Sequence, residues 1–380
     1  MKKHYIIIFS TLCVFVQTHV FAQFNCNNNR YQLPIFSNVS VTNGITFGQN
    51  LSNTNAIVTL RMDIYQPQGD TATRRPVVIL AFGGSFISGS RTSPDVVHIC
   101  NQLARRGYVA VSIDYRTGIS FGAPNQLPDR FKEAVWRAMQ DGRAAIRFFR
   151  KDAQTSNLYK IDPNYIFIGG VSAGGIGACH VGYINKSSEF PGGIDTLTYG
   201  NFEGNSGNPG YSSRPKGVIN LCGAIGDLSY LSDNQQTPIV SVHGNQDPTV
   251  PYKTNVYSFG GIAISTLNGS YVIDSTAAAY GIPSTLKTFK GQGHVPFVNS
   301  PATNLYMDTT VQTIVQFLAQ QINCTSTGIE GDKNLKDKVE WLKIYPNPAQ
   351  NFIRLDWESK ANETIKKISV YDITDRKSHV

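Results

Sequence analysis

The segment Phe167-Ile168-Gly169-Gly170-Val171-Ser172-Ala173-Gly174-Gly175-Ile176 contains a serine in the frame Gly-x-Ser-x-Gly, directly after an apolar run. This pattern is typical of a sharp turn that joins a buried strand to a helix. Neighbouring backbone comes close on such a turn, and we expect glycine at positions 170 and 174 because a Cβ there would clash. The segment therefore predicts that Ser172 is a nucleophile at the end of a strand.

The histidines provide the candidate base that a serine nucleophile requires. Four of the seven lie between the N-terminal leader and the C-terminal end, namely His98, His180, His243 and His294. His98 and His180 fall within amphipathic helical stretches, where a packed or solvated ring is expected, and His243 ends an apolar run. His294 follows a strand, and the glycines before it allow its imidazole to reach a serine on a neighbouring strand end. We therefore predict that His294 is the base.

The acid of such a triad accepts the Nδ1 proton of the histidine and stabilises the imidazolium. In the chain order Ser…Asp/Glu…His, the acid lies between the two other residues. Asp247 meets this condition just beyond an apolar strand, and we predict that it is the acid. Asp227, which follows the strand expected at 217–225, is the alternative. Asp274 and Asp308 are weaker candidates, because neither follows a strand-like run.

Four ordered segments resemble those of carboxylesterases and hormone-sensitive-lipase-like enzymes. Val77–Phe86 is similar to their His-Gly-Gly-Gly/Ser segment, and 105–116 is similar to the strand that follows it. The sequences His-Gly-Asn-Gln-Asp at 243–247 and Gly-x-Gly-His at 291–294 resemble their acid and base segments. The resemblance covers residues 55–322 and points to the α/β-hydrolase superfamily, but it indicates no particular substrate.

This resemblance implies an oxyanion hole made of backbone N–H groups. By the family pattern the donors are Ala173, which follows the nucleophile, and Gly84 and Ser85 from the loop after the third strand. Loss of one such donor costs about 3 kcal/mol of transition-state stabilisation. Phe82 stands where the family has a histidine, but side-chain identity barely affects a hole built from backbone groups. The chemistry requires no cofactor.

Alternating apolar and amphipathic stretches predict the fold class. Continuous apolar runs are typical of strands that are buried on both faces of a parallel sheet. Strands are expected at 77–82, 108–113, 165–169, 217–225, 238–243 and 285–290, with helices near 94–106, 129–151 and 304–321. Residues 59–65 alternate with period two, as in a half-exposed edge strand. We predict an α/β chain with the α/β-hydrolase fold, a mostly parallel doubly wound sheet, and a small C-terminal β segment.

Two long segments interrupt this alternation. Residues 185–216 are rich in glycine and asparagine, and residues 253–284 separate the acid from the strand before the base. Loops of this length are usually functional or mobile. No large helical cap is expected, so we predict an open cleft. Calcium coordination by the Asn and Glu side chains of the first segment is an alternative without further support.

The N-terminal leader predicts export. Lys2 and Lys3 precede a mostly apolar stretch, and Val20-Phe21-Ala22 resembles a cleavage site, so a signal peptide is expected over 1–22. The apolar stretch is too short for a transmembrane segment, and no other segment qualifies. Loss of the two lysines lowers the formal net charge from +8 to +6. These charges are spread along the chain, which gives little support to nucleic-acid binding.

Five cysteines follow the leader: Cys26, Cys100, Cys179, Cys222 and Cys324. None forms a Cys-x-x-Cys pair, and the histidines lack ligand spacing, so no metal is expected. Cys100 and Cys179 are expected to be packed thiols. Cys26 and Cys324 flank the predicted hydrolase and would tie its ends together if they pair, but spacing does not determine connectivity.

The chain is long enough for one large domain plus an appendage. We expect a catalytic domain over 23–325, a linker over 326–338 and a separate segment over 339–380. Within the last segment, 344–349 and 368–372 resemble strands of a type IX secretion C-terminal sorting domain, here shorter than usual. The resemblance implies the type IX secretion machinery as a partner and a secreted or cell-surface protein that passes through the periplasm.

These features together predict a secreted serine esterase that acts on carboxylic esters through an acyl-enzyme intermediate. An alternative is a hydrolase of polysaccharide side chains, acetyl or feruloyl, or of polyesters, which would make the ester substrate polymeric. A peptidase is less favoured because the chain is too short for an additional propeller. A non-catalytic binding protein is also less favoured, because all three triad residues are present.

Overall fold

The computed structural model describes residues 24, 26–189, 191, 194, 196–232 and 236–324, together with four short strands beyond residue 341. Internal contacts divide the chain into two units, Met1–Thr325 and Ser326–Val380. The signal peptide expected over 1–22 and the linker expected over 326–338 lie outside the described residues. The domain boundaries therefore stay a prediction.

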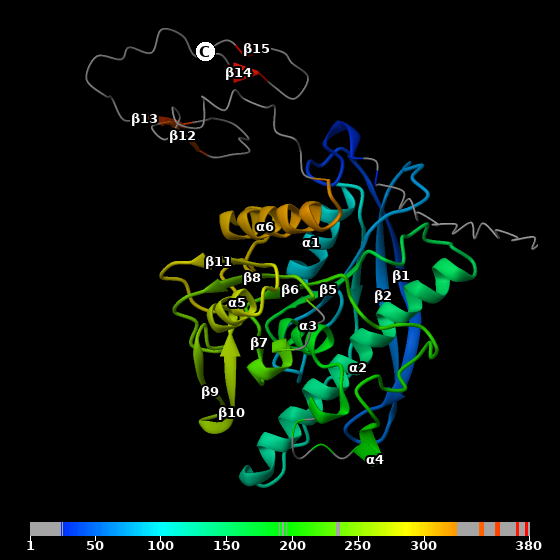
Figure 1. Ribbon diagram of the computed structural model, residues 1–380, viewed down its shortest axis with the longest axis vertical. Coiled ribbons are helices and arrows are strands. Elements are labelled where there is room, and N and C mark those ends of the chain that lie inside the picture. Colours follow the sequence, from blue (N-terminus) through cyan, green and yellow to red (C-terminus); the bar gives the residue numbers. More distant parts are fainter. Residues whose placement is uncertain are drawn as a thin grey trace, which may run out of the picture. The chain divides into compact units, whose positions relative to one another are not determined.

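An eight-stranded sheet forms the centre of the first unit (Figure 1). The strand order is β1-β2-β4-β3-β5-β6-β8-β11. β1 and β2 are antiparallel to their neighbours, whereas β4, β3, β5, β6, β8 and β11 are parallel. The strands are β1 Val39–Leu51, β2 Ile57–Pro67, β3 Val77–Ala81, β4 Val109–Ile113, β5 Ile166–Val171, β6 Gly217–Leu221, β8 Ile239–Gly244 and β11 Ser284–Phe289.

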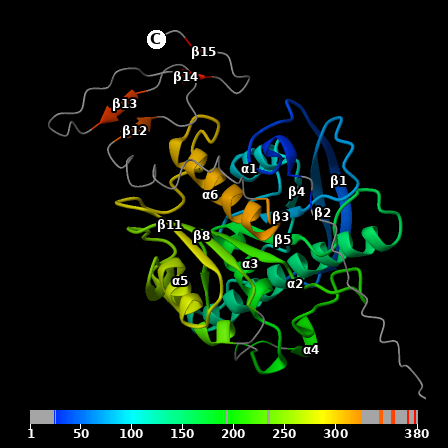
Figure 2. The same ribbon diagram turned by 45° about the horizontal axis from the view of Figure 1, so that its top comes forward.

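Helices cover both faces of this sheet. Figure 2 shows α1 and α6 on one face and α2 and α3 on the other. The helices are α1 Pro94–Ala104, α2 Leu127–Gln154, α3 Ala173–Tyr183, α5 Ser270–Ala279 and α6 Leu305–Gln321. The mostly parallel, doubly wound α/β fold predicted from the alternating sequence pattern is therefore confirmed.

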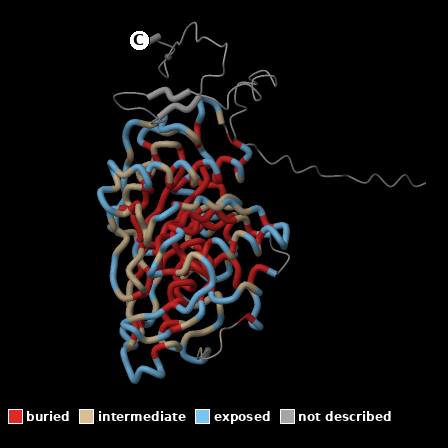
Figure 3. Tube along the Cα trace, turned by 90° about the vertical axis from the view of Figure 1, so that its left-hand side faces the viewer, coloured by how far each residue is buried: buried red, intermediate tan, exposed pale blue. Residues whose placement is uncertain are grey.

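The central strands are buried because their side chains face helices on both sides. Every residue of β3, β4, β5, β6 and β8 is buried, and Figure 3 shows this buried interior. The prediction of an edge strand at 59–65 is wrong, because β2 lies between β1 and β4. Asp63 is one of the polar residues whose alternation with apolar residues suggested an exposed strand face. Its buried carboxylate is paired with Arg91 at 2.9 Å, so a polar residue there does not mark an exposed face.

The segment 253–284 was expected to be a long loop, and that expectation is wrong. It forms a hairpin of β9 Thr254–Phe259 and β10 Ile262–Gly269, followed by α5. The hairpin turn uses Gly260 and Gly261, which both have positive φ. β10 also pairs with the short strand β7 Ala224–Ile225, so the segment is built onto the hydrolase body.

The glycine- and asparagine-rich segment 185–216 is held by arginines of α2. Within its described part are a 3-10 turn, Ser187–Glu189, and the short helix α4 Thr196–Tyr199. The carboxylate of Glu203 pairs with Arg143 at 2.7 Å and with Arg147 at 3.0 Å. The acidic group that calcium coordination would need is therefore engaged by two guanidinium groups.

A disulfide joins Cys26 to Cys324, and their Cα atoms are 5.4 Å apart. It links the two ends of the first unit, across a sequence separation of 298 residues. Cys100, Cys179 and Cys222 are free and buried. Two of these, Cys100 and Cys179, match the expectation of packed thiols.

The second unit contains two pairs of antiparallel strands in its described part, which agrees with the predicted C-terminal β segment. They are β12 Leu342–Tyr345 with β13 Arg354–Trp357, and β14 Val370–Tyr371 with β15 Lys377–Ser378. Among the helices of the described residues, none combines the length and apolar character required to span a membrane.

Candidate active site

The direction of the strand order changes at β3. β4 lies on one side of β3 and β5 lies on the other, so the loops after β3 and β5 diverge. In open α/β sheets, ligands bind in the crevice that forms outside the carboxyl ends of the strands at such a point. The loop that begins at Phe82 and the turn at Ser172 both lie at this crevice.

Ser172 occupies the sharp turn between β5 and α3. Its φ and ψ are 54° and −114°, a conformation rare for a residue with a side chain. A Cβ added to Gly170 would lie 2.4 Å from the carbonyl carbon of Gly174, and one added to Gly174 would lie 2.3 Å from the oxygen of Ala81. Both glycines are therefore required by the close backbone, as the sequence pattern suggests.

His294 lies between Ser172 and Asp247. Its Nε2 atom is 2.8 Å from Ser172 Oγ, and its Nδ1 atom is 2.6 Å from Asp247 Oδ2. The side chain of His294 is 18% exposed, whereas that of Asp247 is 0% exposed. Solvent therefore reaches His294 but not Asp247. The structure brings together all three side chains that were predicted from the sequence.

Asp247 is surrounded by hydrogen-bond donors. Its Oδ1 atom accepts from the backbone N–H groups of Thr249 and Val250 at 2.8 and 2.9 Å. Its Oδ2 atom accepts from His294 and from Nε2 of His243 at 3.0 Å. Burial by itself raises the pKa of Asp247, but the hydrogen bonds from the two imidazoles and the backbone outweigh it. The net pKa is well below its ordinary value, so the carboxylate is the stable form.

The loops that carry Asp247 and His294 are joined to each other. The N–H of Gln246 donates to the carbonyl of Gln292 at 2.9 Å, and the N–H of Gly291 donates to the Asn245 side chain at 2.7 Å. A Cβ on Gly244 would lie 2.2 Å from the oxygen of Gly293. The two loops therefore pack without space for a side chain, which fixes the position of the histidine.

The loop after β3 lies against the serine. A Cβ added to Gly83 would be 3.3 Å from the Cβ of Ser172. Gly84, Ser85 and Phe86 have consecutive positive φ values of 127°, 55° and 61°. In the described part of the chain, the N–H groups of Gly84, Ser85 and Ala173 donate to no protein acceptor. They are available to an anion beside Ser172, and the α3 N-terminus adds a positive potential there.

Phe82 occupies the position at which the resemblance led us to expect a histidine. Its ring stacks on that of Tyr115 with centroids 4.3 Å apart. The Tyr115 hydroxyl also donates to the Phe82 carbonyl at 3.1 Å. This pair fixes the start of the loop by packing and by one hydrogen bond, so the loop keeps its place without an imidazole.

The alternative acids lie elsewhere. Asp227 is exposed and accepts from the N–H of Ser229, and Asp274 accepts from the hydroxyl of Ser284. Asp308 is in the first turn of α6. Among the described residues, none of these three carboxylates is hydrogen-bonded to His294.

The alternative bases are packed within helices. His180 is buried and bonds the carbonyl of Ile176 at 2.8 Å, and His98 is half-buried on α1. Burial lowers the pKa of both rings. They match the packed-ring interpretation of their helical stretches.

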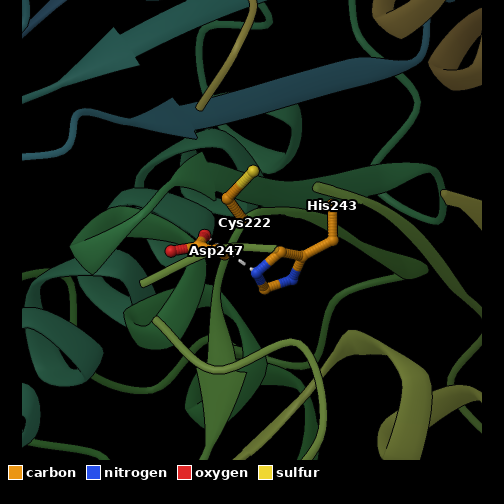
Figure 4. A group of neighbouring side chains, drawn as sticks. All are labelled: Cys222, His243 and Asp247. Atoms are coloured by element: carbon orange, nitrogen blue, oxygen red, sulfur yellow. Dashed lines mark hydrogen bonds and ion pairs between the residues drawn. The ribbon is translucent and has the colours of Figure 1, made fainter. Parts of the chain in front are cut away.

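One cluster of possible metal ligands lies beside the acid in the described part of the chain. Figure 4 shows Cys222, His243 and Asp247, whose ligand atoms are within 4.8 Å of one another. Both ring nitrogens of His243 are already engaged, Nδ1 with the Ser270 hydroxyl and Nε2 with Asp247. Asp247 Oδ2 already accepts from two imidazoles. These residues therefore do not fit a metal site.

Sequence reasoning gave no role to His243. The residue is the last but one of β8, four positions before Asp247, and its ring contacts the same carboxylate oxygen as His294. Its place in the His-Gly-Asn-Gln-Asp segment was a signal, but a sequence does not reveal which way a strand-end side chain points.

Comparison with known proteins agrees with this fold. Residues 62–223 match the BD-FAE family model, which describes esterase- and lipase-like α/β-hydrolases. The match includes the serine turn and the loop after β3, but it ends before the acid and the base. The first unit has the α/β-hydrolase fold, and its residues 62–223 are similar to this esterase-like family. The superfamily resemblance predicted from the motifs is thereby confirmed.

Solved structures share the fold of this α/β-hydrolase. The native form of Thermogutta terrifontis esterase 2 matches with a TM-score of 0.51 and 22% identity, over 77% of this chain and 95% of that chain. The propionate-bound form matches with a TM-score of 0.50 and 22% identity, over 74% and 94%. At this identity, the likeness supports the fold alone.

A curated relative matches a shorter part of the hydrolase. The quorum-quenching protein AidA of Acinetobacter baumannii is 33% identical over 113 residues, which are 30% of this chain. The chain spans about a third of the length of this relative, 32%.

The second unit carries an export signal. Residues 343–377 match the model of the secretion system C-terminal sorting domain. This domain marks proteins that type IX secretion exports to the cell surface or the extracellular space. The predicted localisation of the hydrolase is therefore confirmed.

Proposed function

We propose that this α/β-hydrolase is a serine esterase that hydrolyses carboxylic esters outside the cell. The observation that carries the proposal is His294, which bonds Ser172 through Nε2 at 2.8 Å and Asp247 through Nδ1 at 2.6 Å. A base placed between a hydroxyl and a buried carboxylate can take the hydroxyl proton, because the carboxylate stabilises the imidazolium that forms.

In the first half of the reaction, Ser172 Oγ attacks the carbonyl carbon of the ester while its proton passes to His294 Nε2. The carbonyl oxygen becomes an oxyanion that accepts hydrogen bonds from Ala173 and from Gly84 or Ser85. The bond from carbon to the alcohol oxygen then breaks, and His294 gives its proton to that oxygen. An acyl group remains on Ser172.

The second half reverses these roles with water as the nucleophile. His294 takes a proton from a water molecule, whose oxygen attacks the acyl carbon on Ser172. The oxyanion forms against the same N–H groups, and its collapse breaks the bond to Ser172 Oγ. His294 returns the proton to Ser172, and the carboxylic acid leaves.

A cavity beside the first turn of α3 offers space for an apolar part of the ester. It has a volume of about 180 Å³, which suits a small group rather than a drug-sized ligand. Phe131 on its wall packs against Phe86 of the loop after β3, with ring centroids 5.5 Å apart. Its other lining residues include the apolar Val135, Trp136, Met139, Ile176 and Leu267 and the polar Lys132, His180 and Asp227. We propose that a short acyl chain occupies it.

The substitution Ser172→Ala tests the proposal. Turnover of a short-chain nitrophenyl ester should fall by about 10³-fold or more, because the nucleophile is lost. Ser275→Ala on α5 is the matched control, since its exposed hydroxyl contacts only the nearby Val272 carbonyl among described residues. It should keep the turnover of the unmodified protein. Thermal unfolding of both variants establishes that they are folded, and full turnover by a folded Ser172→Ala variant would refute the mechanism.

The class of ester requires a second measurement. A panel of soluble esters with different acyl and alcohol groups, acetylated and feruloylated polysaccharides, and a polyester film would be compared at equal enzyme concentration. We expect the protein to hydrolyse soluble short-chain esters, and this hydrolysis to depend on Ser172. Cleavage of amide substrates alone would contradict it.

A further inference from the structure

His243 is a buried histidine next to the triad, with a partner at each ring nitrogen. It is 0% exposed. Its Nε2 atom lies 3.0 Å from Asp247 Oδ2 and 3.1 Å from the carbonyl oxygen of Val250. Its Nδ1 atom lies 2.7 Å from the hydroxyl of Ser270. A buried polar ring with every site engaged is held in one orientation.

The direction of these hydrogen bonds follows from the partners. A carboxylate and a carbonyl only accept, so the hydrogen must be on Nε2 of His243. The hydroxyl of Ser270 already accepts from the Nδ2 atom of Asn220 at 3.0 Å. Its own hydrogen is therefore free to point at Nδ1 of His243. This network fits a neutral imidazole that donates to Asp247.

Asn220 anchors this network in the sheet. It is 0% exposed and is part of β6. Its amide nitrogen also donates to the hydroxyl of Ser241 on β8 at 3.2 Å, and its amide oxygen accepts from the N–H of Gly223 at 2.9 Å. A continuous chain of hydrogen bonds thus runs from β6, through Ser270 at the start of α5, to the ring beside the acid.

We propose that His243 is a positioning residue, which fixes the Asp247 carboxylate and shares its negative charge so that His294 binds and releases the catalytic proton. The inference rests on the proposed function of the triad. Asp247 Oδ2 is the shared atom, because it accepts from His243 and His294 alike. Without the hydrogen bond from His243, the full negative charge on Asp247 Oδ2 would act on His294.

Few titratable groups face His243, which simplifies its electrostatics. Asp247 faces Nε2, the Cys222 thiol lies in the same cluster, and the Tyr252 ring packs edge-on with its centroid 5.7 Å away. His294 lies beyond Asp247. Because burial raises the pKa of Cys222 to about 12, the thiol is neutral near neutral pH. Asp247 is then the charge that His243 meets directly.

Removal of the donor should change both the rate and its pH dependence. His243→Phe keeps a ring but loses both nitrogens, so Asp247 would hold the proton on His294 more strongly. We expect kcat to fall by about 10- to 100-fold, with KM within about twofold. The midpoint of the acid limb of kcat/KM should move to higher pH by about 0.5–1 unit. His243→Gln offers an amide N–H instead, and it should recover part of both changes.

If His243 had a purely structural role, the measurements would differ. Its replacement would lower the fraction of folded enzyme while each folded molecule kept a normal rate and pH profile. Titration of Ser172 with a fluorophosphonate probe counts the active molecules, so that kcat is expressed per active site. Thr310→Val is the matched control, because it removes a buried hydroxyl of α6 that bonds only the Tyr306 carbonyl among described residues. It should leave the pH profile unchanged.

Two further measurements keep the inference testable if His243→Phe does not fold. Ser270→Ala removes the partner of Nδ1, together with the acceptor of the Asn220 amide, but keeps the His243 ring. The acid-limb midpoint should move in the same direction by a smaller amount. In the unmodified protein, nitrogen-15 NMR of labelled histidine should assign the hydrogen of His243 to Nε2. A hydrogen on Nδ1 alone would overturn the inference, as would a normal per-site kcat and midpoint in folded His243→Phe.

The two proposals fail in different ways. If the probe does not label Ser172 in the unmodified protein, the proposed function fails. If the probe labels Ser172 and His243→Phe behaves as the unmodified protein, only the role of His243 fails.

Discussion

The Nε2 atom of His294 lies 2.8 Å from the Oγ atom of Ser172, although 122 residues separate the two along the chain. Ser172 follows β5 and His294 follows β11, with β6 and β8 between them in the sheet. All four strands are parallel, so their carboxyl ends meet at one edge. The sheet therefore sets this short distance, and changes that disturb the backbone at that edge should affect the chemistry first.

Gly174→Ala should destabilise the hydrolase. The new Cβ would lie 2.3 Å from the Ala81 carbonyl oxygen, and such backbone contacts cannot relax without a shift of β3 or α3. We expect a loss of about 1–3 kcal/mol in the free energy of unfolding, measured by denaturant titration. Gly177→Ala on the same helix is the control, since its Cβ meets only Ala138 at 3.6 Å. That change should stabilise the helix by up to about 1 kcal/mol, and equal destabilisation by both would contradict the steric argument.

Asp247→Asn should lower kcat by about 10⁴-fold, because the imidazole loses the partner that fixes its tautomer. It should also change how stability depends on pH. The pKa of Asp247 is lower in the folded protein than in the unfolded chain, so its stabilisation is complete above about pH 4 and is lost as the pH falls further.

The difference in unfolding free energy between the unmodified protein and Asp247→Asn should therefore be largest near neutral pH and shrink in acid. Denaturant titrations of both proteins over this range measure it. A difference that stays constant with pH would show that the carboxylate contributes no charge-dependent stability.

Asp141→Ala should destabilise the protein by about 3–5 kcal/mol, because it leaves a buried guanidinium without its counter-ion. Asp141 pairs with Arg116 at 3.0 Å, and both side chains are almost fully buried. The control is Asp129→Ala on the same helix, whose pair with Lys132 is exposed. That change should cost less than about 1 kcal/mol. Similar thermal unfolding temperatures for the two variants would contradict the prediction.

Ser265→Trp should lower the activity on esters with longer acyl groups more than on acetyl esters. Ser265 lines the cavity beside α3 from β10, and an indole would fill much of its volume of about 180 Å³. We expect kcat/KM for a butanoyl ester to fall by about tenfold more than for an acetyl ester. Thr266→Trp, on the opposite face of the strand, is the control. It should leave the ratio of kcat/KM between the two esters unchanged. If both variants keep the ratio, the acyl chain does not use this cavity.

Sequence patterns alone anticipated the central sheet well. The apolar runs at 77–82, 108–113 and 165–169 correspond to β3, β4 and β5 within one or two residues, because strands buried on both faces leave a continuous apolar signal. The motifs also led to Ser172, Asp247 and His294, which the structure brings within hydrogen-bond distance. Their catalytic roles stay a prediction until the variants are measured.

Features that depend on distant partners were not anticipated. The alternation in β2 suggested an exposed face, but pairing with β1 and the Asp63–Arg91 contact removed it. The hairpin of β9 and β10 lacks a continuous apolar run, and much of its stabilisation comes from packing such as Tyr257 against Phe131, with ring centroids 5.0 Å apart. The contacts of His243 with Ser270 and Asp247 are likewise encoded by no local pattern.

The bond between Cys26 and Cys324 has a consequence for the order of maturation. The two cysteines are separated by 298 residues along the chain. The disulfide can therefore form only after translation has reached Cys324. Thiols are kept reduced in the cytosol, so covalent closure must wait for an oxidising compartment. Before oxidation, only non-covalent contacts hold the two ends of the hydrolase, and the disulfide then limits their unravelling.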